Sequence, residues 1–129
     1  MKTLPTLLNF VITTLQLSPI ISVVRIISTR AFSQYQFTLK VRAELTDGSL
    51  LQVRLYRNGT HIDYAYQLVR HHKPVMRWDN KEHFPAISSY PHHFHHPFGH
   101  VEASPLTGDP ADDLPEVLNF LTSTLTPPQ

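Results

Sequence analysis

The sequence predicts an α+β fold: a five-stranded antiparallel meander sheet with an N-terminal and a C-terminal helix packed on one face. Three observations predict it. Both ends of the chain carry apolar residues at helical spacing, the middle alternates apolar and polar residues, and Asp-Gly and Asn-Gly pairs separate the alternating segments. The length fits one domain, residues 1–129, and the 41% of apolar residues suffice for one modest core.

The N-terminal stretch MKTLPTLLNFVITTLQLSP predicts an amphipathic helix. Its apolar residues recur on one helical face: Leu4, Leu7, Leu8, Val11, Ile12 and Leu15. Ser18-Pro19 ends the helix, because proline disfavours helical backbone in the residue before it. We expect no signal peptide, since polar residues interrupt the apolar run and no small-x-small cleavage site follows. No run in the sequence is long and apolar enough to cross a bilayer, so no membrane contact is expected.

Two strands are expected next. The segment from Ile20 to Ser28 is rich in β-branched residues and nearly continuous in apolarity, which predicts a strand buried on much of both faces. The segment QYQFTLKVRAEL, residues 34–45, places apolar residues at odd positions and polar residues at even positions. This alternation predicts a strand with one face in the core and one face in water.

The turns predict how the following strands pair. A three-residue Thr-Asp-Gly loop with Gly48 in the left-handed conformation pairs Val41 with Val53 and keeps the apolar residues on one face. A one-residue slip would turn the whole apolar set outward, so the longer loop is favoured over a two-residue Asp-Gly loop. A two-residue Asn-Gly loop then pairs Leu55 with Ile62.

The chain is expected to end with a short strand, a linker and a helix. The strand VMRW puts Met76 and Trp78 into the core, and a Pro/Gly linker follows later. The C-terminal helix is expected over about residues 112–125, with Asp113 as its N-cap and Glu116 completing a capping box. Its apolar stripe is Leu114, Val117, Leu118, Leu121 and Leu125.

The face of the sheet that no helix covers is expected to carry polar side chains from four strands. They are Lys40, Arg42, Gln52, Arg54, Tyr56, His61, Asp63, Gln67 and Arg77. Lys40, Arg42 and Arg54 are predicted to contact a nucleic-acid backbone, where each contact to phosphate releases counterions. The alternative is an ordinary salt-bridged wet face, in which Arg54 opposes Asp63 across a hairpin.

Charge is unevenly distributed along a chain whose formal net charge is +1. From Arg25 to Arg77 there are nine Lys or Arg and three Asp or Glu, whereas from Asp79 to Gln129 there are one Lys and seven Asp or Glu. The basic middle predicts a phosphate-rich partner. It is equally consistent with a solubilising face that has an acidic counterpart in the same chain.

A His-rich segment covers residues 77–100 of a chain that has nine histidines and no cysteine. The missing cysteine excludes disulfides and thiolate zinc sites. In an extended chain, His93 and His95 share one side and Phe94 lies on the other. Several of these rings could instead simply cap turns beside the neighbouring prolines.

An acid/base site is the first hypothesis for this segment. Imidazole titrates near neutral pH, so His92 and His93 are candidates to move protons during RNA cleavage at a ribose 2′-hydroxyl. Arg77 would stabilise the charged transition state, and Asp79 would orient a histidine. The candidate catalytic set is Arg77, Asp79, His83, His92, His93 and His95.

Two further hypotheses stay open. His93 and His95 can ligate zinc or another transition metal, with a third ligand among His83, His100 and Asp79. The acid/base hypothesis needs no cofactor, and none is expected apart from this divalent metal. The last hypothesis is a non-enzymatic binding module whose His/Trp surface docks a partner protein.

Four segments in this order resemble the TumE-like toxins of bacterial and archaeal toxin–antitoxin modules: VRAELTDGSLLQVRLY, YAYQL, RWDN and YPHHFHH. The resemblance covers roughly residues 41–95. The matching positions are Arg42, Asp47, Gly48, Arg54, Tyr66, Arg77, Asp79, Asn80, His83, Pro91, His92, His93 and His95. The family's Ala-Pro-His-His is Lys-Glu-His83-Phe84 here, so one histidine is missing; if that histidine is catalytic, this copy is weakened.

The resemblance implies a small cytoplasmic toxin encoded beside an antitoxin with a helix-turn-helix DNA-binding domain. RNA as the target, and hence endoribonuclease activity, follows only by analogy with other small toxins that combine an antiparallel sheet with helices to cut mRNA. A homodimer is an open alternative for its assembly.

Overall fold

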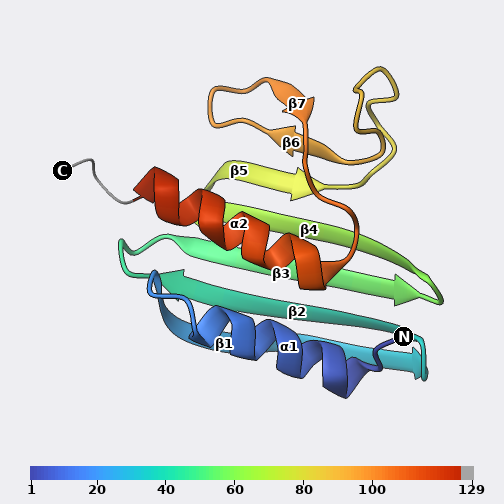
Figure 1. Ribbon diagram of the computed structural model, residues 1–129. Helices are drawn as coiled ribbons and strands as arrows, with labels where there is room; N and C mark the ends of the chain where they lie inside the picture. The colour runs from blue at the N-terminus through green and yellow to red at the C-terminus, as the bar shows by residue number, and fades with distance from the viewer. Residues whose placement is uncertain (126–129) are drawn as a thin grey trace.

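The computed structural model describes residues 1–125 and shows seven strands between two helices (Figure 1). The helices are α1 (Leu4–Gln16) and α2 (Pro110–Leu125). The strands are β1 (Ile21–Ser33), β2 (Gln36–Leu45), β3 (Leu50–Asn58), β4 (His61–Arg70), β5 (Lys73–Asp79), β6 (His93–His95) and β7 (Val101–Ala103). The strands pair antiparallel in chain order, from β1 to β7, in one sheet.

The α+β class and the antiparallel meander are confirmed, but the predicted number of five strands is wrong. The two additional strands have three residues each: β6 lies within the His-rich segment, and β7 follows directly after it. Strands this short carry no readable alternation, and β6 consists of two histidines around Phe94. Pairing with the free edge of β5, rather than local sequence preference, makes β6 a strand.

Both helices lie on the same face of the sheet, which we call the helix face; the opposite side is the open face (Figure 1). Leu7, Val11 and Leu15 of α1 are buried, as the helical spacing predicts. In α2, the predicted stripe is buried from Leu114 to Leu121. Neither helix within residues 1–125 is long and apolar enough to span a membrane.

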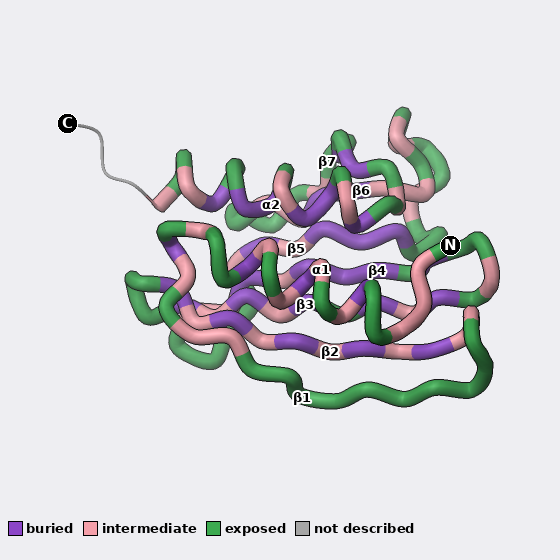
Figure 2. The backbone as a smooth tube through the Cα atoms, turned by 60° about the horizontal axis from the view of Figure 1, so that its bottom comes forward, coloured by how far each residue is buried: buried purple, intermediate pink, exposed green. Residues whose placement is uncertain are grey.

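The first strand differs from its prediction, because β1 is exposed along most of its length (Figure 2). It is the edge strand of the sheet, and Ile26 and Phe32 are 52% and 53% exposed. Figure 2 shows its tube in green, whereas β2 to β5 alternate or are buried. Burial of a β-branched run needs a neighbour on each side, and an edge strand lacks one.

The register of the β2–β3 hairpin is confirmed, with Val41 opposite Val53. The β3–β4 register differs from the prediction by two residues: Leu55 faces Tyr64 rather than Ile62. The turn is Gly59-Thr60 rather than Asn-Gly, and a shift of two residues keeps each side chain on its face. The faces are therefore as expected, but Arg54 lies opposite Ala65 and not opposite Asp63.

The N-terminal cap of α2 is also corrected. The helix begins at Pro110, and Asp109 caps it by accepting a hydrogen bond from the Ala111 N–H at 3.0 Å. Asp113, the predicted cap, lies within the first turn and is buried. Its carboxylate accepts hydrogen bonds from the backbone N–H groups of Thr107 and Gly108, both at 2.8 Å, so it fastens the linker to the helix.

Candidate functional site on the open face

The strand registers align open-face side chains in two transverse rows. Directly opposed residues of antiparallel strands project to the same face and lie about 4.5–5.5 Å apart. The first row, from β1 to β6, is Arg25, Arg42, Gln52, Gln67, Arg77 and His95. The second row is Ser28, Lys40, Arg54, Ala65, Asp79 and His93. Cations from four strands thus share one surface with two histidines and a carboxylate at its β6 end.

Three of these cations have no acidic neighbour. Within residues 1–125, Lys40, Arg42 and Arg54 have no carboxylate oxygen within 4.0 Å. Asp63, which could have paired with Arg54, instead contacts the His61 ring at 2.8 Å. The salt-bridged alternative predicted from the sequence therefore does not describe this part of the face.

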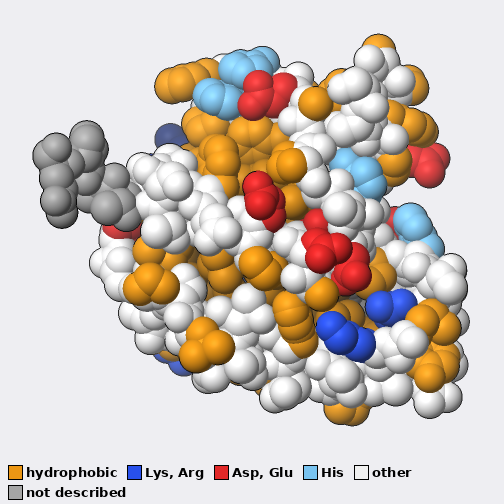
Figure 3. Space-filling view, in the orientation of Figure 1, with side chains coloured by type: hydrophobic (Ala, Val, Ile, Leu, Met, Phe, Trp, Pro, Cys, Tyr) orange, Lys and Arg blue, Asp and Glu red, His pale blue; other side chains and the backbone are white. Residues whose placement is uncertain are grey.

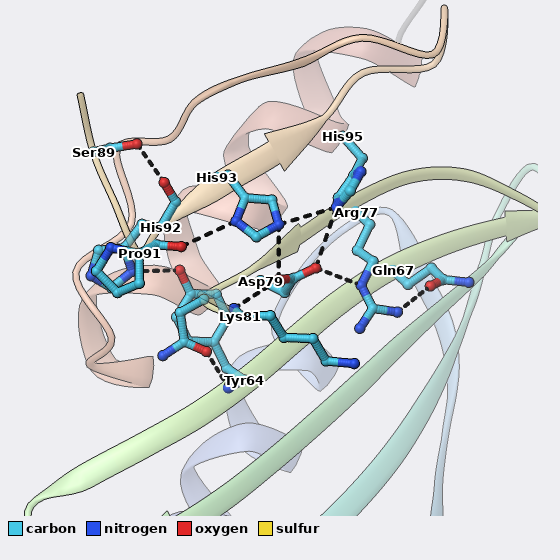
Figure 4. A network of polar contacts seen from close by, with 11 residues as sticks. Tyr64, Gln67, Arg77, Asp79, Lys81, Ser89, Pro91, His92, His93 and His95 are labelled. Carbon is cyan, nitrogen blue, oxygen red and sulfur yellow. Dashed lines mark hydrogen bonds and ion pairs between the residues drawn. The ribbon is translucent and has the colours of Figure 1, made fainter. Parts of the chain in front are cut away.

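Asp79 is the centre of a buried cluster at the β5–β6 end of the rows (Figure 4). Its Oδ1 lies 2.9 Å from Nε2 of His93 and accepts a hydrogen bond from the Lys81 N–H at 3.0 Å. Its Oδ2 accepts a hydrogen bond from Nε of Arg77 at 2.8 Å and lies 3.5 Å from Nε2 of His95. We call Asp79, His93 and His95 the Asp-His cluster.

The surroundings favour the ionised form of Asp79. Burial raises the pKa of this carboxyl, but the hydrogen bonds from Lys81 and Arg77 and the charges of His93 and Arg77 outweigh burial. The pKa therefore lies below its ordinary value, and the carboxylate is charged at neutral pH. The site therefore contains a fixed negative charge beside His93 and His95.

The two imidazoles differ in access to solvent. The His93 side chain is 2% exposed, whereas that of His95 is 37% exposed. Burial lowers the pKa of His95, and the charges of His93 and Arg77 act in the same direction against Asp79. The lowered pKa favours the neutral form of the accessible ring, the form in which imidazole accepts a proton or binds a metal.

Arg77 lies between two hollows of the open face. Its guanidinium is oriented on both sides, by Asp79 and by the Gln67 side chain, whose oxygen accepts a hydrogen bond from Nη1 at 2.8 Å. One hollow, of about 270 Å³, is lined by Arg54, Tyr56, Asp63, Tyr64, Ala65, Arg77, Asn80 and Lys81. The other, of about 360 Å³, is lined by Gln67, Pro74, Val75, Met76, Arg77, His95, His96, Pro97 and Gly99.

Two predicted site residues do not join the cluster. The His92 ring stacks against Tyr64 on the helix face, and its Nδ1 is hydrogen-bonded to the Tyr64 hydroxyl at 2.8 Å. His83 is exposed in the loop after β5, with its ring against Phe84. The structure thus brings together Arg77, Asp79, His93 and His95 and leaves His83 and His92 outside.

Phe84 stands where the resemblance described above places a second histidine, and its ring contacts the cluster. Its ring centroid is 4.8 Å from that of His93 and 5.9 Å from that of His95, both edge-to-face. An apolar ring therefore shields the imidazoles at a position where another histidine would add a polar group.

Asn80 and Pro91 are among the positions that match the family, but the sequence assigned no role to the residues that hold the cluster in place. The Pro91 carbonyl oxygen lies 3.1 Å from Nδ1 of His93. The buried Asn80 side chain bonds the backbone of Ile62 and Tyr64, which fixes the chain directly after Asp79 against β4. Gln67 was expected on this face but not beside Arg77; the β4–β5 register is the signal that pairs them.

The helix face has a different surface. Figure 3 shows Asp and Glu side chains near the centre of this face, along α2 and the segment before it, whereas Lys and Arg side chains appear as a small group near the lower right and in small areas at the left edge. Trp78, one of the residues considered for partner docking, is 3% exposed and packs against Phe94 and Phe120. It belongs to the core and offers no docking surface.

Within residues 1–125, the fold and site define a small α+β protein with one helix-free sheet face, which carries cations without carboxylate partners and an Asp-His cluster. The chain belongs to the TumE toxin family: the family model described as Toxin TumE matches residues 11–125. No curated protein and no solved structure gives a significant match. Family membership makes this chain the toxin of a toxin–antitoxin system, with an antitoxin as its partner.

Proposed function

We propose that this toxin acts on RNA as an endoribonuclease and binds the phosphate backbone along the two rows of the open face. One observation carries the proposal: the rows that present Lys40, Arg42 and Arg54 end at Arg77 and the Asp-His cluster. Cations without carboxylate partners are available to phosphates, and a backbone that follows the rows reaches the cluster.

The hollows on either side of Arg77 support a position for the scissile phosphate. Arg77 would contact its oxygens, with one neighbouring nucleotide in each hollow. Tyr56 lines the first hollow and offers a ring on which a base can stack, while Arg54 and Lys81 line it as cations. His95 lines the second hollow.

The proposed reaction is a transesterification: phosphorus forms a bond to the 2′-oxygen and loses its bond to the 5′-oxygen of the next nucleotide. The 2′-hydroxyl loses its proton to the Asp-His cluster through the accessible edge of His95, and the 2′-oxygen attacks phosphorus. The bond to the 5′-oxygen breaks, and that oxygen takes a proton from water. Arg77 stabilises the negative charge of the transition state, while buried His93 and Asp79 position His95.

The proposal revises the roles predicted from the sequence. His95 takes the place given to His92 and His93, because His92 lies on the helix face and His93 is almost fully buried. His83 has no role in the reaction. The cytoplasm as location, a helix-turn-helix antitoxin as partner and a homodimer remain expectations.

The test compares growth on expression and RNA cleavage by the purified protein. We expect His95→Ala and Arg77→Ala to relieve growth arrest and to reduce cleavage of single-stranded RNA at least about 100-fold. His100→Ala is the matched control, since this exposed histidine stacks on His96 outside the cluster and lines neither hollow, and it should leave both measurements unchanged.

The outcome that contradicts the proposal is specific. If the folded wild-type protein arrests growth but cleaves no RNA, with or without added divalent metals, the target is not RNA. If His95→Ala and His100→Ala are equally toxic, the cluster is not the reaction centre.

A further inference from the structure

Asp79, His93 and His95 each present a ligand atom within 4.8 Å of the other two. Nε2 of His93 lies 3.1 Å from Nε2 of His95 and 2.9 Å from Oδ1 of Asp79, and Nε2 of His95 lies 3.5 Å from Oδ2 of Asp79. We propose that these three residues bind one divalent transition-metal ion, of which zinc is the representative.

The separations fit a shared ligand sphere. With metal–nitrogen bonds of about 2.0–2.1 Å, neighbouring ligand atoms are about 3.0 Å apart at octahedral positions and about 3.4 Å apart at tetrahedral ones. The two imidazole nitrogens are 3.1 Å apart, and their distances to the carboxylate, 2.9 Å from His93 to Oδ1 and 3.5 Å from His95 to Oδ2, bracket these two values. Two imidazoles and one carboxylate are also a donor set that zinc, iron and nickel accept.

The tautomer of His93 strengthens the inference. Nδ1 of His93 faces the Pro91 carbonyl oxygen, which only accepts hydrogen bonds, so Nδ1 carries the hydrogen. In the neutral ring, Nε2 then presents a lone pair to the carboxylate oxygen of Asp79 at 2.9 Å. This contact is favourable only when a cation lies between the two atoms, either a proton on the ring or a metal ion.

The groups around the donors resemble the outer shell of a metal site. A ligating histidine usually donates its other N–H to a carbonyl or carboxylate, as His93 does to Pro91. The Lys81 N–H and Arg77 fix the carboxylate of Asp79, and Phe84 covers the rings with an apolar side chain. The exposed side of His95 leaves room for water or substrate.

The only other group of this kind within residues 1–125 is His96, His100 and Glu102. His100 and Glu102 are exposed, with side chains 55% and 49% exposed, and His96 and His100 stack ring on ring at 4.3 Å. Without burial and without a carbonyl to fix a ring, this group offers a weaker site. It provides an internal comparison for the proposed one.

Metal binding goes beyond the proposed function, because it is measured without RNA. If RNA cleavage also holds, a bound metal would move the activation of the 2′-hydroxyl from the His95 ring to metal-bound water at the same place. If a chelator abolishes RNA cleavage and zinc restores it, the metal site takes part in the cleavage. If metal-free protein cleaves RNA equally well with and without chelator, metal binding and RNA cleavage are independent.

The experiment uses full-length protein purified without a polyhistidine tag and freed of metal. Zinc is titrated by calorimetry, and cobalt(II) replaces it as a spectroscopic probe whose visible bands report nitrogen ligation and geometry. We expect one zinc site per chain that His95→Ala weakens at least about tenfold, since even changes to groups behind the ligands cost 10- to 100-fold. The double variant His96→Ala/His100→Ala should retain this site.

Folding is controlled by circular dichroism, and His95→Gln provides a second variant at an accessible position. Zinc should also raise the Tm of the wild-type protein and of the His96→Ala/His100→Ala variant, because it binds only the folded cluster. No zinc binding by folded wild-type protein would overturn the inference. So would binding that His96→Ala/His100→Ala abolishes while His95→Ala and His95→Gln leave it intact.

Discussion

At the scale of single residues, Asp79 connects most of the site. Its two carboxylate oxygens contact a backbone N–H, a guanidinium and two imidazoles, although only 3% of its side chain is exposed. A buried carboxylate is tolerated because the Lys81 N–H and the Arg77 guanidinium both donate hydrogen bonds to it. The arrangement fixes Arg77 and His95 in position, with His95 open to solvent, so these two side chains can act on a ligand without reorganising.

The geometry of Arg77 gives the first prediction. Arg77→Lys keeps the positive charge but cannot contact Asp79 and Gln67 at once, because an ammonium lacks the planar fork of a guanidinium. We expect RNA cleavage to fall at least about tenfold while the unfolding free energy changes little.

Rates with labelled single-stranded RNA and urea unfolding curves check this expectation. Arg25→Lys is the control, since Arg25 lies in the same row at the far edge of the sheet. Equal rates for Arg77→Lys and wild type would show that the charge alone suffices.

The sequence predicted some of these residues and could not predict others. Alternation placed His93 and His95 on one side of the chain. Alternation along the preceding strand likewise placed Arg77 and Asp79 on one side. Nothing local indicated that β6 would pair with β5 in the register that sets His93 opposite Asp79. That pairing joins segments 14 residues apart through a loop, and only the three-dimensional fold determines it.

At the scale of elements, two of the hairpin turns contain residues with positive φ, where a substitution changes the backbone strain. The β4–β5 turn consists of His71 and His72, whose φ angles are +52° and +63°. The β3–β4 turn has Gly59 at φ +64°, where glycine is unstrained. Side chains with a Cβ in this left-handed region cost free energy, and Asn-Gly is the preferred pair for a two-residue turn of this kind.

These turns give a pair of opposite predictions. His71→Asn/His72→Gly should raise the unfolding free energy by about 1 kcal/mol, because both residues then suit positive φ. Gly59→Ala should lower it by about 1 kcal/mol; no atom lies within 4 Å of the added Cβ, so the cost comes from φ alone. Urea unfolding measures both changes, and changes of the same sign would contradict the assignment.

The β2–β3 turn gives a pH-dependent prediction. Burial raises the pKa of Asp47, but hydrogen bonds from Ser49 and the charge of Arg70 outweigh burial and hold the pKa below 3.8. A lowered pKa in the folded state stabilises the fold above the unfolded-state pKa, and this contribution is lost as the pH falls through the folded value. Asp47→Asn should therefore destabilise the protein at pH 7 but not in acid.

We expect Asp47→Asn to lower the unfolding free energy by about 0.5–1 kcal/mol at pH 7. The loss is small because the Asp47 side chain is 35% exposed and water screens its charge. It should approach zero in acid, at pH values below the lowered pKa of the folded state. Urea unfolding at both pH values measures it, with Glu82→Gln as a control at an exposed loop carboxylate. A loss of equal size at both pH values would assign the effect to the turn's shape and not to its charge.

Elements were predictable where a periodic pattern extends over many residues. The predictions were wrong where contacts with other elements decide burial or the position of a helix cap. The helical stripes placed α1 and most of α2, and the alternation of β2 gave its faces. The β-branched run of β1 predicted burial that its position at the sheet edge does not provide. In α2 the cap was misplaced because Asp109 and Asp113 both precede apolar residues, and only the hydrogen bonds distinguish them.

At the scale of the whole molecule, the uneven charge along the chain becomes a difference between two faces. Within residues 1–125, the only Lys or Arg ion pair joining the basic middle to the acidic C-terminal part is Arg77–Asp79. Acidic side chains occupy the centre of the helix face in Figure 3, whereas the two rows lie on the opposite face. The acidic segment therefore does not neutralise Lys40, Arg42 and Arg54, and their field is available to a polyanion.

The last prediction uses salt dependence to locate the RNA on the molecule. Each phosphate contact by Lys or Arg adds about −0.7 to the slope of log affinity against log salt for a single strand. Arg54→Gln removes one cation from the open face and should make the slope shallower by roughly 0.7. Lys2→Gln removes one cation beside α1, where Lys2 lies over the Phe10 ring, and should leave the slope unchanged.

Both variants change the net charge by one. A general effect of net charge would therefore change the two slopes equally, whereas a local contact to phosphate would change only the slope of Arg54→Gln. Fluorescence anisotropy with a labelled oligonucleotide at several salt concentrations measures the slopes, and the inactive His95→Ala background prevents cleavage during the titration. Equal slopes for Arg54→Gln and Lys2→Gln would mean that RNA, if bound, does not follow the rows, because a backbone on the open face must lose a counterion-releasing contact when Arg54 is removed.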